Sequence, residues 1–199
     1  RGTNKLTRAA ESSTRTDMDG WRRATGITTG PDSRVETGPT AEAFPPRDVP
    51  AHMDLTFLGT GSAMPTGRRA QTGFLVESGE HRLLVDCGSG VLSALARTDA
   101  GYEGVDTVLL THHHLDHVSD LLPLVKARWL AGAESLTIAG PEGTSDLVSD
   151  LLDVHDYMQD RIDLTLRDVS GGFELAGFEV ESHPTRHSMH CLAYRLTPR

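Results

Sequence analysis

The sequence predicts an α+β domain, and three observations lead to this fold class. Helical segments alternate with short apolar strand segments in the region that follows residue 53. Closely spaced strand segments, separated by turn residues, follow near its end. A cluster of histidines comes directly after one apolar strand, at the strand end where open α/β sheets place their sites. This mixture fits half of an αββα sandwich better than a doubly wound parallel sheet.

The expected strands are apolar runs bounded by turn residues. We place them at residues 55–58, 73–77, 82–86, 105–110, 136–139, 162–169, 173–175 and 178–180, with a last strand after His187. Ser78, Gly79 and Glu80 should join the second and third strands as a hairpin. Helices are expected at residues 91–97, 119–130 and 144–157, the last with Leu147, Leu151 and Val154 on one face.

Residues 1–52 differ in composition from the remainder. They are rich in Thr, Gly, Arg and Pro and lack apolar periodicity, so we expect a disordered or non-native extension. The globular domain should cover residues 53–199. Because the sequence shows no apolar signal segment and no run that could span a membrane, we expect a cytoplasmic protein with no membrane partner.

Metal-ligand chemistry is concentrated in one turn of the chain. The cluster consists of His112, His114, Asp116 and His117, with His113 between them. Neutral imidazole is the commonest metal ligand, and several histidines beside a carboxylate are hard to satisfy without a cation. Alternating side chains in an extended turn would direct His112 and His114 to one metal and the other two to a second. We expect His113 to be structural or solvent-facing.

The pattern His-x-His-x-Asp-His resembles the signature of the metallo-β-lactamase superfamily. Residues 57–69 look like the opening of its ribonuclease Z branch, and residues 83–90 look like the second block of that branch. Gly59, Gly61 and Gly67 of the first block would let the backbone approach an anionic substrate. In the second block, Asp86 would either support a ligating histidine or serve as a turn or N-cap residue.

The resemblance implies roles for single residues. His112 and His114 would bind one ion together with a downstream histidine. His183, His187 and His190 are the candidates, and His187 has the family's spacing to an Ala-Tyr-Arg strand. Asp116 would act catalytically by orienting or deprotonating the metal-bound water, whose hydroxide form is the nucleophile. The implied metal is Zn²⁺, two ions in the intact enzyme, although these ligands also accept Mn²⁺ or Fe.

The second metal site raises a question of completeness. Two-metal members of the superfamily use a later bridging aspartate and a final histidine, and neither follows the Ala-Tyr-Arg strand in residues 196–199. Asp116 and His117 alone would make a poor zinc site. We therefore expect a C-terminally truncated domain with the first half to two-thirds of the sandwich, or completion by a partner chain, for which a homodimer is one form. A truncated, non-catalytic metal-binding domain is one alternative function.

The charge of the domain is strongly negative. Residues 53–199 contain 21 of the 28 acidic and 11 of the 19 basic residues, and Lys126 is their single lysine. Acidic, lysine-poor surfaces are expected in concentrated salt, where screening removes self-repulsion, so we expect a halophilic habitat. The sequence shows no basic face of the kind that nucleic-acid enzymes usually present, although Arg68, Arg69 and Arg82 could form a local patch.

The leading functional prediction is a ribonuclease Z-like phosphodiesterase or nuclease that acts on a small phosphodiester or on RNA. Two departures from the branch argue against transfer RNA processing. Residues 65–70 lack the Lys and Asn of its Pro-x-Lys-x-Arg-Asn loop, and Gly88-Ser89-Gly90 replaces its Gly-Glu-Gly. The acidity and the missing lysine favour an alternative, a hydrolase of a thioester, lactone or sulfate ester on the same fold.

Overall fold

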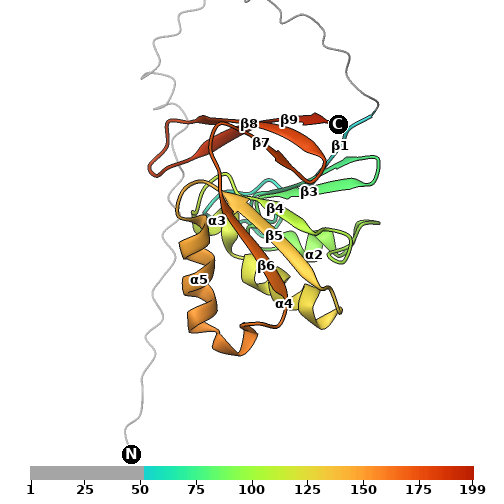
Figure 1. Cartoon of the computed structure of the whole chain (residues 1–199), viewed down its shortest axis with the longest axis vertical. Helices are drawn as coiled ribbons and strands as arrows, with labels where there is room; N and C mark the ends of the chain where they lie inside the picture. Colours follow the sequence, from blue (N-terminus) through green and yellow to red (C-terminus); the bar gives the residue numbers. More distant parts are fainter. Residues whose placement is uncertain (1–51) are drawn as a thin grey trace, which may run out of the picture. The chain divides into compact units, whose positions relative to one another are not determined.

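The computed structural model describes residues 52–199, which form three stacked layers (Figure 1). Helices form one outer layer, a six-stranded sheet lies in the middle, and a three-stranded sheet covers the other face of the six-stranded sheet (Figure 1). The layering agrees with the expected part of an αββα sandwich. The extension expected at residues 1–52 falls, apart from its last residue, outside the described residues.

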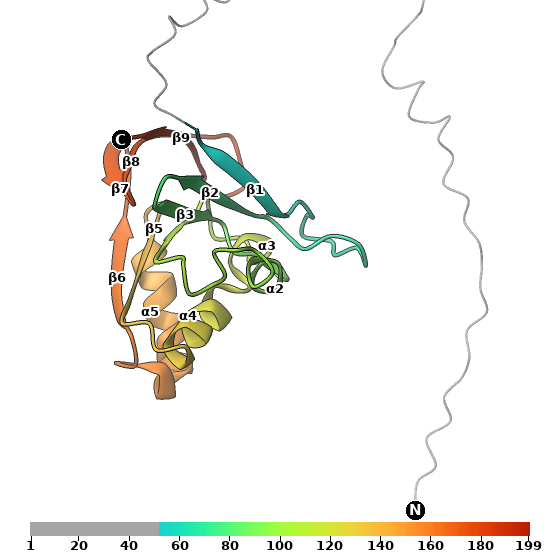
Figure 2. The ribbon, with the colours of Figure 1, turned by 90° about the vertical axis from the view of Figure 1, so that its right-hand side faces the viewer.

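The six-stranded sheet follows the order of the chain. Its strands are β1 (Asp54–Gly59), β2 (Gly73–Ser78), β3 (His81–Val85), β4 (Thr107–Leu109), β5 (Ser135–Gly140) and β6 (Asp163–Asp168). Strands β1, β2 and β3 pair antiparallel, whereas β3 to β6 pair parallel. Figure 2 shows the two edge strands, β1 and β6, on opposite sides of the view. The expected hairpin between β2 and β3 is present, and its Gly79 has a positive φ of 60° that glycine adopts readily.

The remaining elements flank this sheet. The antiparallel three-stranded sheet contains β7 (Gly172–Leu175), β8 (Phe178–Pro184) and β9 (Leu192–Pro198). The helices are α2 (Val91–Leu95), α3 (Leu115–Val118), α4 (Leu121–Leu130), α5 (Thr144–Val154) and the 3₁₀ turn η1 (Asp156–Met158). No helix among residues 52–199 is long and apolar enough to cross a membrane.

Strands β2 to β5 are buried on both faces, which explains their continuous apolar sequences. In β4, Val108 packs against the helices and Leu109 packs against the smaller sheet. The same division separates Ile138 from Ala139 in β5. Successive side chains of a strand point to opposite faces, so each pair of neighbours contributes to two apolar cores. This double burial sets the orientation of β4, after which Leu110 and Thr111 lead to the histidine cluster.

The helix expected at residues 119–130 starts two residues later, as α4 at Leu121, and a separate short helix, α3, precedes it at Leu115–Val118. The turn α3 is closed by hydrogen bonds from the His117 N–H to the His114 carbonyl and from the Ser119 N–H to the Leu115 carbonyl. The carboxylate of Asp120 then accepts the N–H groups of Gly90 and Leu92, at 2.8 and 3.0 Å. This contact with α2 holds Asp120 outside helical geometry, with φ −92° and ψ 3°, and α4 starts afresh after it.

The helix expected to end at residue 157 is shorter, because α5 ends at Val154. The three apolar side chains expected on one face also do not share one environment. Val154 is 79 % exposed, and the fully buried positions of the helix are Thr144 and Val148. His155 departs from helical geometry, with φ −114° and ψ 52°, and η1 turns the chain toward β6.

Candidate metal centre

Three histidine side chains from distant parts of the chain meet at one point. The Nε2 atom of His187 lies 3.2 Å from Nε2 of His112 and 3.0 Å from Nδ1 of His114. Nε2 of His112 and Nδ1 of His114 are 3.0 Å apart. Within residues 52–199, this is the one group of three or more metal-capable side chains whose ligand atoms lie within 4.8 Å of one another. The structure therefore brings together the three histidines that the sequence selected.

The triangle of nitrogens fits a metal ion better than it fits hydrogen bonding. A neutral imidazole has one N–H group, so three ring nitrogens that face one another cannot all be satisfied by mutual hydrogen bonds. A tetrahedral zinc ion with Zn–N bonds of 2.0–2.1 Å places two nitrogen ligands about 3.3–3.4 Å apart. The observed separations of 3.0–3.2 Å are close to that value. The three nitrogens could hold one ion and leave an open position.

A second layer of polar groups orients His112. Its Nδ1 atom lies 2.9 Å from the hydroxyl of Thr111, and that hydroxyl lies 2.9 Å from Oδ2 of Asp86. A hydroxyl that donates to the carboxylate accepts the Nδ1–H of His112, which leaves Nε2 with its lone pair toward the metal position. Asp86 is 1 % exposed and also accepts the backbone N–H of Thr111 at 2.8 Å. The contact favours the supporting role of Asp86 over its reading as an N-cap.

The same carboxylate orients His117. Nδ1 of His117 lies 2.7 Å from Oδ2 of Asp86, so its Nε2 atom is the free one. That Nε2 atom lies 3.7 Å from Oδ2 of Asp116. The ring of His117 also lies against the ring of His112, with 4.0 Å between centroids. His117 and Asp116 are thus adjacent to the triangle, although both belong to α3 and not to the extended turn that we expected.

The surroundings shift the proton affinities of two of these rings in opposite directions. Burial, with the neighbouring His117, lowers the pKa of His112 to about 4, so its ring is neutral at neutral pH, as a metal ligand requires. Burial would also lower the pKa of His117, but its hydrogen bond to Asp86 and the charges of Asp86 and Asp116 raise this pKa above its usual value. Asp86 therefore favours a proton on His117 where no cation competes for it.

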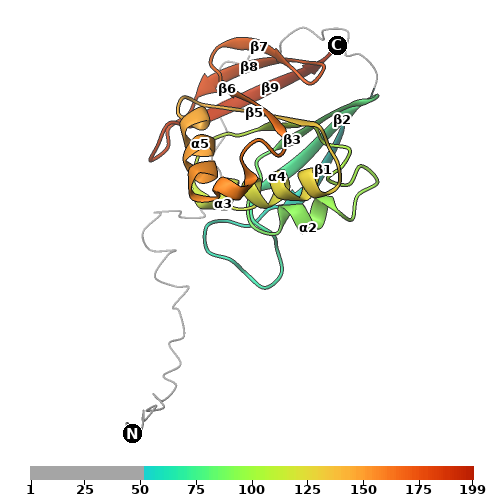
Figure 3. The same ribbon diagram turned by 60° about the horizontal axis from the view of Figure 1, so that its bottom comes forward.

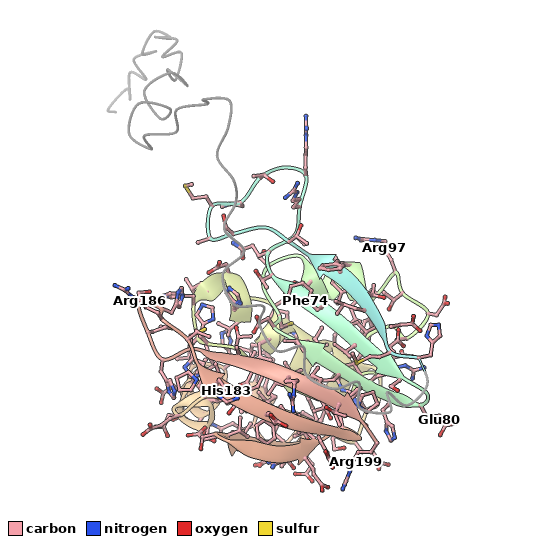
Figure 4. The ribbon with its side chains drawn as sticks, turned by 90° about the horizontal axis from the view of Figure 1, so that it is seen from above. Phe74, Glu80, Arg97, His183, Arg186 and Arg199 are labelled. Atoms are coloured by element: carbon pink, nitrogen blue, oxygen red, sulfur yellow. The ribbon has the colours of Figure 1, made fainter. Side chains whose placement is uncertain are left out.

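Strand β9 brings His187 to the site. The N–H of Leu192 donates to the Thr111 carbonyl at 3.0 Å, and the Tyr194 hydroxyl donates to the Leu110 carbonyl at 2.9 Å. These two bonds join the smaller sheet to the chain that follows β4. His187 lies in the loop between β8 and β9, and this loop also carries Arg186, labelled at one end of the smaller sheet in Figure 4.

The other histidines of the two segments take no part in the triangle. His183 is an exposed residue of β8 that pairs with Ala193 of β9, and Figure 4 shows it on the smaller sheet. His190 is exposed in the following loop. Nε2 of His113 lies 2.8 Å from the hydroxyl of Thr144 at the start of α5, in agreement with a structural role. Of the three candidate histidines, His187 is the one that the structure places beside His112 and His114.

A cavity of about 710 Å³ opens beside the triangle. The histidines of the triangle line it together with residues of α3 and of the loop after β1; these further lining residues are Ser62, Ala63, Pro65, Gln71, Leu115, Asp116, His117 and Ser119. No Arg or Lys is among the lining residues. A bound anion would therefore rely on the metal centre for its neutralisation at this place.

Gly59, at the end of β1, and Gly61, in the loop after it, leave room for the chain to pack against itself. A Cβ atom on Gly59 would lie 1.7 Å from the carbonyl oxygen of Gln71, and one on Gly61 would lie 2.8 Å from the carbonyl oxygen of Ala70. In the second block, a Cβ on Gly88 would lie 2.0 Å from the carbonyl oxygen of Asp116. For Gly59 and Gly61 of the first block, the structure therefore shows a role in packing, and their expected role in the approach to a substrate stays a prediction. Gly67 has nothing within 4 Å of such an atom.

Comparison with known families decides the relationship of this chain. Residues 53–193 match the sequence profile of a family described as "Anti-Pycsar protein Apyc1". The chain belongs to this family. The matched range of this chain contains both the His112–His117 segment and His187.

Relatives of this chain support its resemblance to ribonuclease Z. The chain is 35 % identical over 150 residues to a ribonuclease Z of Methanopyrus kandleri, an alignment that covers 73 % of this chain and 50 % of the relative. A Mycobacterium avium protein of the same name is 44 % identical over 101 residues, which cover 49 % of this chain and 36 % of the relative. The chain thus spans half or less of the length of these relatives.

Solved structures confirm the fold. The metallo-β-lactamase fold protein YhfI from Bacillus subtilis superimposes with a TM-score of 0.63 at 29 % identity, covering 73 % of this chain and 57 % of that protein. The short form of human tRNase Z also gives 0.63, at 19 % identity, with 73 % and 64 % covered, and shows the fold alone. The chain is a ribonuclease Z-like protein of the metallo-β-lactamase fold.

Proposed function

We propose that this chain carries the metal centre of a hydrolase that cleaves phosphodiester bonds. The observation that supports this function best is the triangle of ring nitrogens from His112, His114 and His187, with separations of 3.0–3.2 Å beside an open cavity. The names of the ribonuclease Z relatives support RNA or a smaller phosphodiester as the substrate. They do not favour a thioester, lactone or sulfate-ester hydrolase, or a non-catalytic domain.

The metal itself is proposed to be zinc, which suits three imidazole ligands and an open position. Such a cation would acidify the attacking water and stabilise the negative charge that develops on the phosphoryl group. The three histidines would hold the ion, and Asp86 would keep His112 in the required tautomer through Thr111. His117 and Asp116 would form the protein part of a second, weaker metal position next to the first.

Asp116 is proposed as the residue that handles the proton of the attacking water. Its side chain lines the cavity, and its Oδ2 atom lies 3.7 Å from Nε2 of His117. A carboxylate at this place can accept a proton or orient the water without being one of the three histidine ligands. The carbonyl of Asp116 accepts the N–H of Thr72 at 3.2 Å, which ties the start of α3 to the residue before β2.

Replacement of Asp116 tests this proposal. In the zinc-loaded full chain, Asp116→Ala should lower kcat for bis-p-nitrophenyl phosphate by about 100-fold or more, because general-base catalysis contributes about 10²–10⁴. Zinc bound by the three histidines should be retained, as measured by atomic emission. A matched control is Asp156→Ala, an exposed carboxylate of η1 that should leave turnover unchanged. Full turnover in the Asp116 variant would refute the assigned role.

A substrate panel tests the reaction class separately. The same preparation should hydrolyse the phosphodiester and leave an aryl sulfate and a thioester unchanged. Hydrolysis of either of these without the phosphodiester would overturn the proposal.

Three further features of the proposal concern the whole protein. Three apolar side chains at and just before β1 are exposed and support association with another copy of the chain: Met53, Leu55 and Phe57, at 47, 52 and 63 %. Analytical ultracentrifugation at micromolar concentration would contradict this if it found a monomer alone. The acidic domain supports a halophilic protein. The proposed location is the cytoplasm, which fractionation of the native cells would check.

A further inference from the structure

The loop between β1 and β2 forms one wall of the cavity beside the triangle. Its residues Ser62, Ala63 and Pro65 line the cavity together with the histidines. The loop projects away from the body of the domain, where it is drawn in teal in Figure 3. Every residue from Ser62 to Arg69 is exposed, so burial of side chains does not hold this wall in place.

One side chain connects this wall to the body of the domain. Nε2 of Gln71 donates to the carbonyls of Ser62 and Ala63 at 3.4 and 3.5 Å. Among the described residues, these are the only hydrogen bonds between residues 62–69 and any residue outside that segment. Inside the segment, Thr66 and Arg69 form an isolated bridge that closes the tip on itself.

Gln71 is itself firmly placed. Its backbone N–H donates to the Ser89 carbonyl at 2.9 Å, and its Oε1 atom accepts the Ser89 N–H at 3.1 Å. Gly59 leaves the room that the Gln71 carbonyl needs. The next residue, Thr72, donates its N–H to the Asp116 carbonyl. The side chain of Gln71 therefore extends from a stretch of backbone that is hydrogen-bonded to Ser89 and to the start of α3.

We propose that Gln71 is a positioning residue that sets the loop wall of the metal pocket and thereby the affinity for substrate. The inference rests on the proposed hydrolytic function, which it extends to a residue that holds no metal. The two ends of the side chain have separate tasks. Oε1 binds Ser89 of the body, and Nε2 binds the wall. Because the bonds to the wall are long, the loss of Nε2 should loosen the wall without unfolding the domain.

Two variants separate these tasks. Gln71→Ala removes both ends of the amide. Gln71→Glu keeps an oxygen that can accept the Ser89 N–H but cannot donate to the carbonyls of Ser62 and Ala63. If the wall is the target, both variants should behave alike. If the contact with Ser89 is all that matters, Gln71→Glu should behave as the wild type, and the proposal is then wrong.

Limited trypsin digestion measures the wall directly and needs no activity. Trypsin can cut after Arg68 or Arg69 at the exposed tip. In the zinc-loaded full chain, both variants should be cut there about two- to tenfold faster than the wild type, the factor expected for one lost hydrogen bond. The control Gln159→Ala, whose amide binds Asp153 at 3.0 Å far along the chain, should leave this rate unchanged. Equal rates in all four proteins would overturn the proposal.

Kinetics measure the consequence for substrate. KM for bis-p-nitrophenyl phosphate should rise by a similar two- to tenfold factor in both variants, while kcat stays within about twofold and zinc content is unchanged. A fall in kcat at constant KM would contradict a role in the wall. If the wild type hydrolyses no phosphodiester, the proposed function fails, and the trypsin rates still decide whether Gln71 holds the wall.

Discussion

At the scale of single residues, the sequence identifies some side chains of the candidate centre and misses others. The histidine pattern predicts the four members of the cluster directly, and a family spacing predicts His187. The tautomer of His112 is set by Thr111, which has no recognisable pattern of its own because its role depends on the distance from its hydroxyl to Asp86. Gln71 likewise has no pattern of its own, because its role depends on a hydrogen bond with Ser89, which is distant in the sequence.

Asp86 provides the prediction at this scale. The side chain accepts the N–H of Thr111 and a ring nitrogen of His117, and it acts on His112 through the Thr111 hydroxyl. Asp86→Asn should lower zinc affinity about 10- to 100-fold, the range typical of a lost outer partner of a ligating histidine. Competition with a fluorescent chelator measures this. Asp106→Asn, an exposed carboxylate, is the control, and equal affinities in both variants would disprove the role of Asp86.

At the scale of elements, strands were predicted better than helices. Strands β2 to β5 are buried on both faces, so continuous apolar runs mark them in the sequence. The short helix α3 carries charged and ligating residues and has one buried side chain, Val118, so it leaves no apolar period. The division between α3 and α4 depends on the contact of Asp120 with α2, which lies 28 to 30 residues away in the sequence. Local patterns do not contain such contacts.

Helix α5 provides the prediction at this scale. Asp168, at the end of β6, accepts the N–H groups of Gly143 and Ser145 at 3.0 and 2.9 Å and therefore caps the helix from a distance. Asp168→Ala should lower the free energy of unfolding by about 1 kcal/mol at pH 7, as loss of an N-cap does. Urea unfolding measures this, with Asp150→Ala on the exposed side of α5 as the control.

The same variant has a defined pH dependence. Burial would raise the pKa of Asp168, but its hydrogen bonds with Ser145 and Gly143 lower it below the usual value. A depressed pKa in the folded state means that the stabilisation is complete above about pH 4, the unfolded value, and disappears as the pH falls through the folded one. The difference between wild type and Asp168→Ala should therefore shrink below about pH 4. A difference that grows in acid would contradict this cap.

At the scale of the whole molecule, the sequence predicted the layers but not their connection. The α+β class and the partial sandwich are confirmed, because strand runs, hairpins and a histidine cluster are local signals. The joining of the two sheets through Tyr194 and Leu192 is a long-range contact, and it is what carries His187 to the other two ligands. The site therefore requires the folded domain and not the histidine segment alone.

The charge of the domain gives a prediction at the same scale. Residues 53–199 hold 21 acidic and 11 basic residues, and mutual repulsion should destabilise the domain in dilute buffer. Molar potassium chloride shortens the screening length from about 8 Å at physiological ionic strength to about 3 Å. The midpoint of thermal unfolding should therefore rise with salt, and less so in the double variant Glu142→Lys and Asp150→Lys. Equal midpoints in dilute and molar salt would refute this adaptation.

The central claim is that His112, His114 and His187 form one metal centre. Its most direct test is the number of zinc ions that the full chain retains after loading and exhaustive dialysis, measured by atomic emission for the wild type and for His187→Ala. We predict about one tightly held zinc per wild-type chain and its loss in His187→Ala, with His183→Ala unchanged. No zinc in the wild type, two tightly held ions, or one ion retained by His187→Ala would contradict the account.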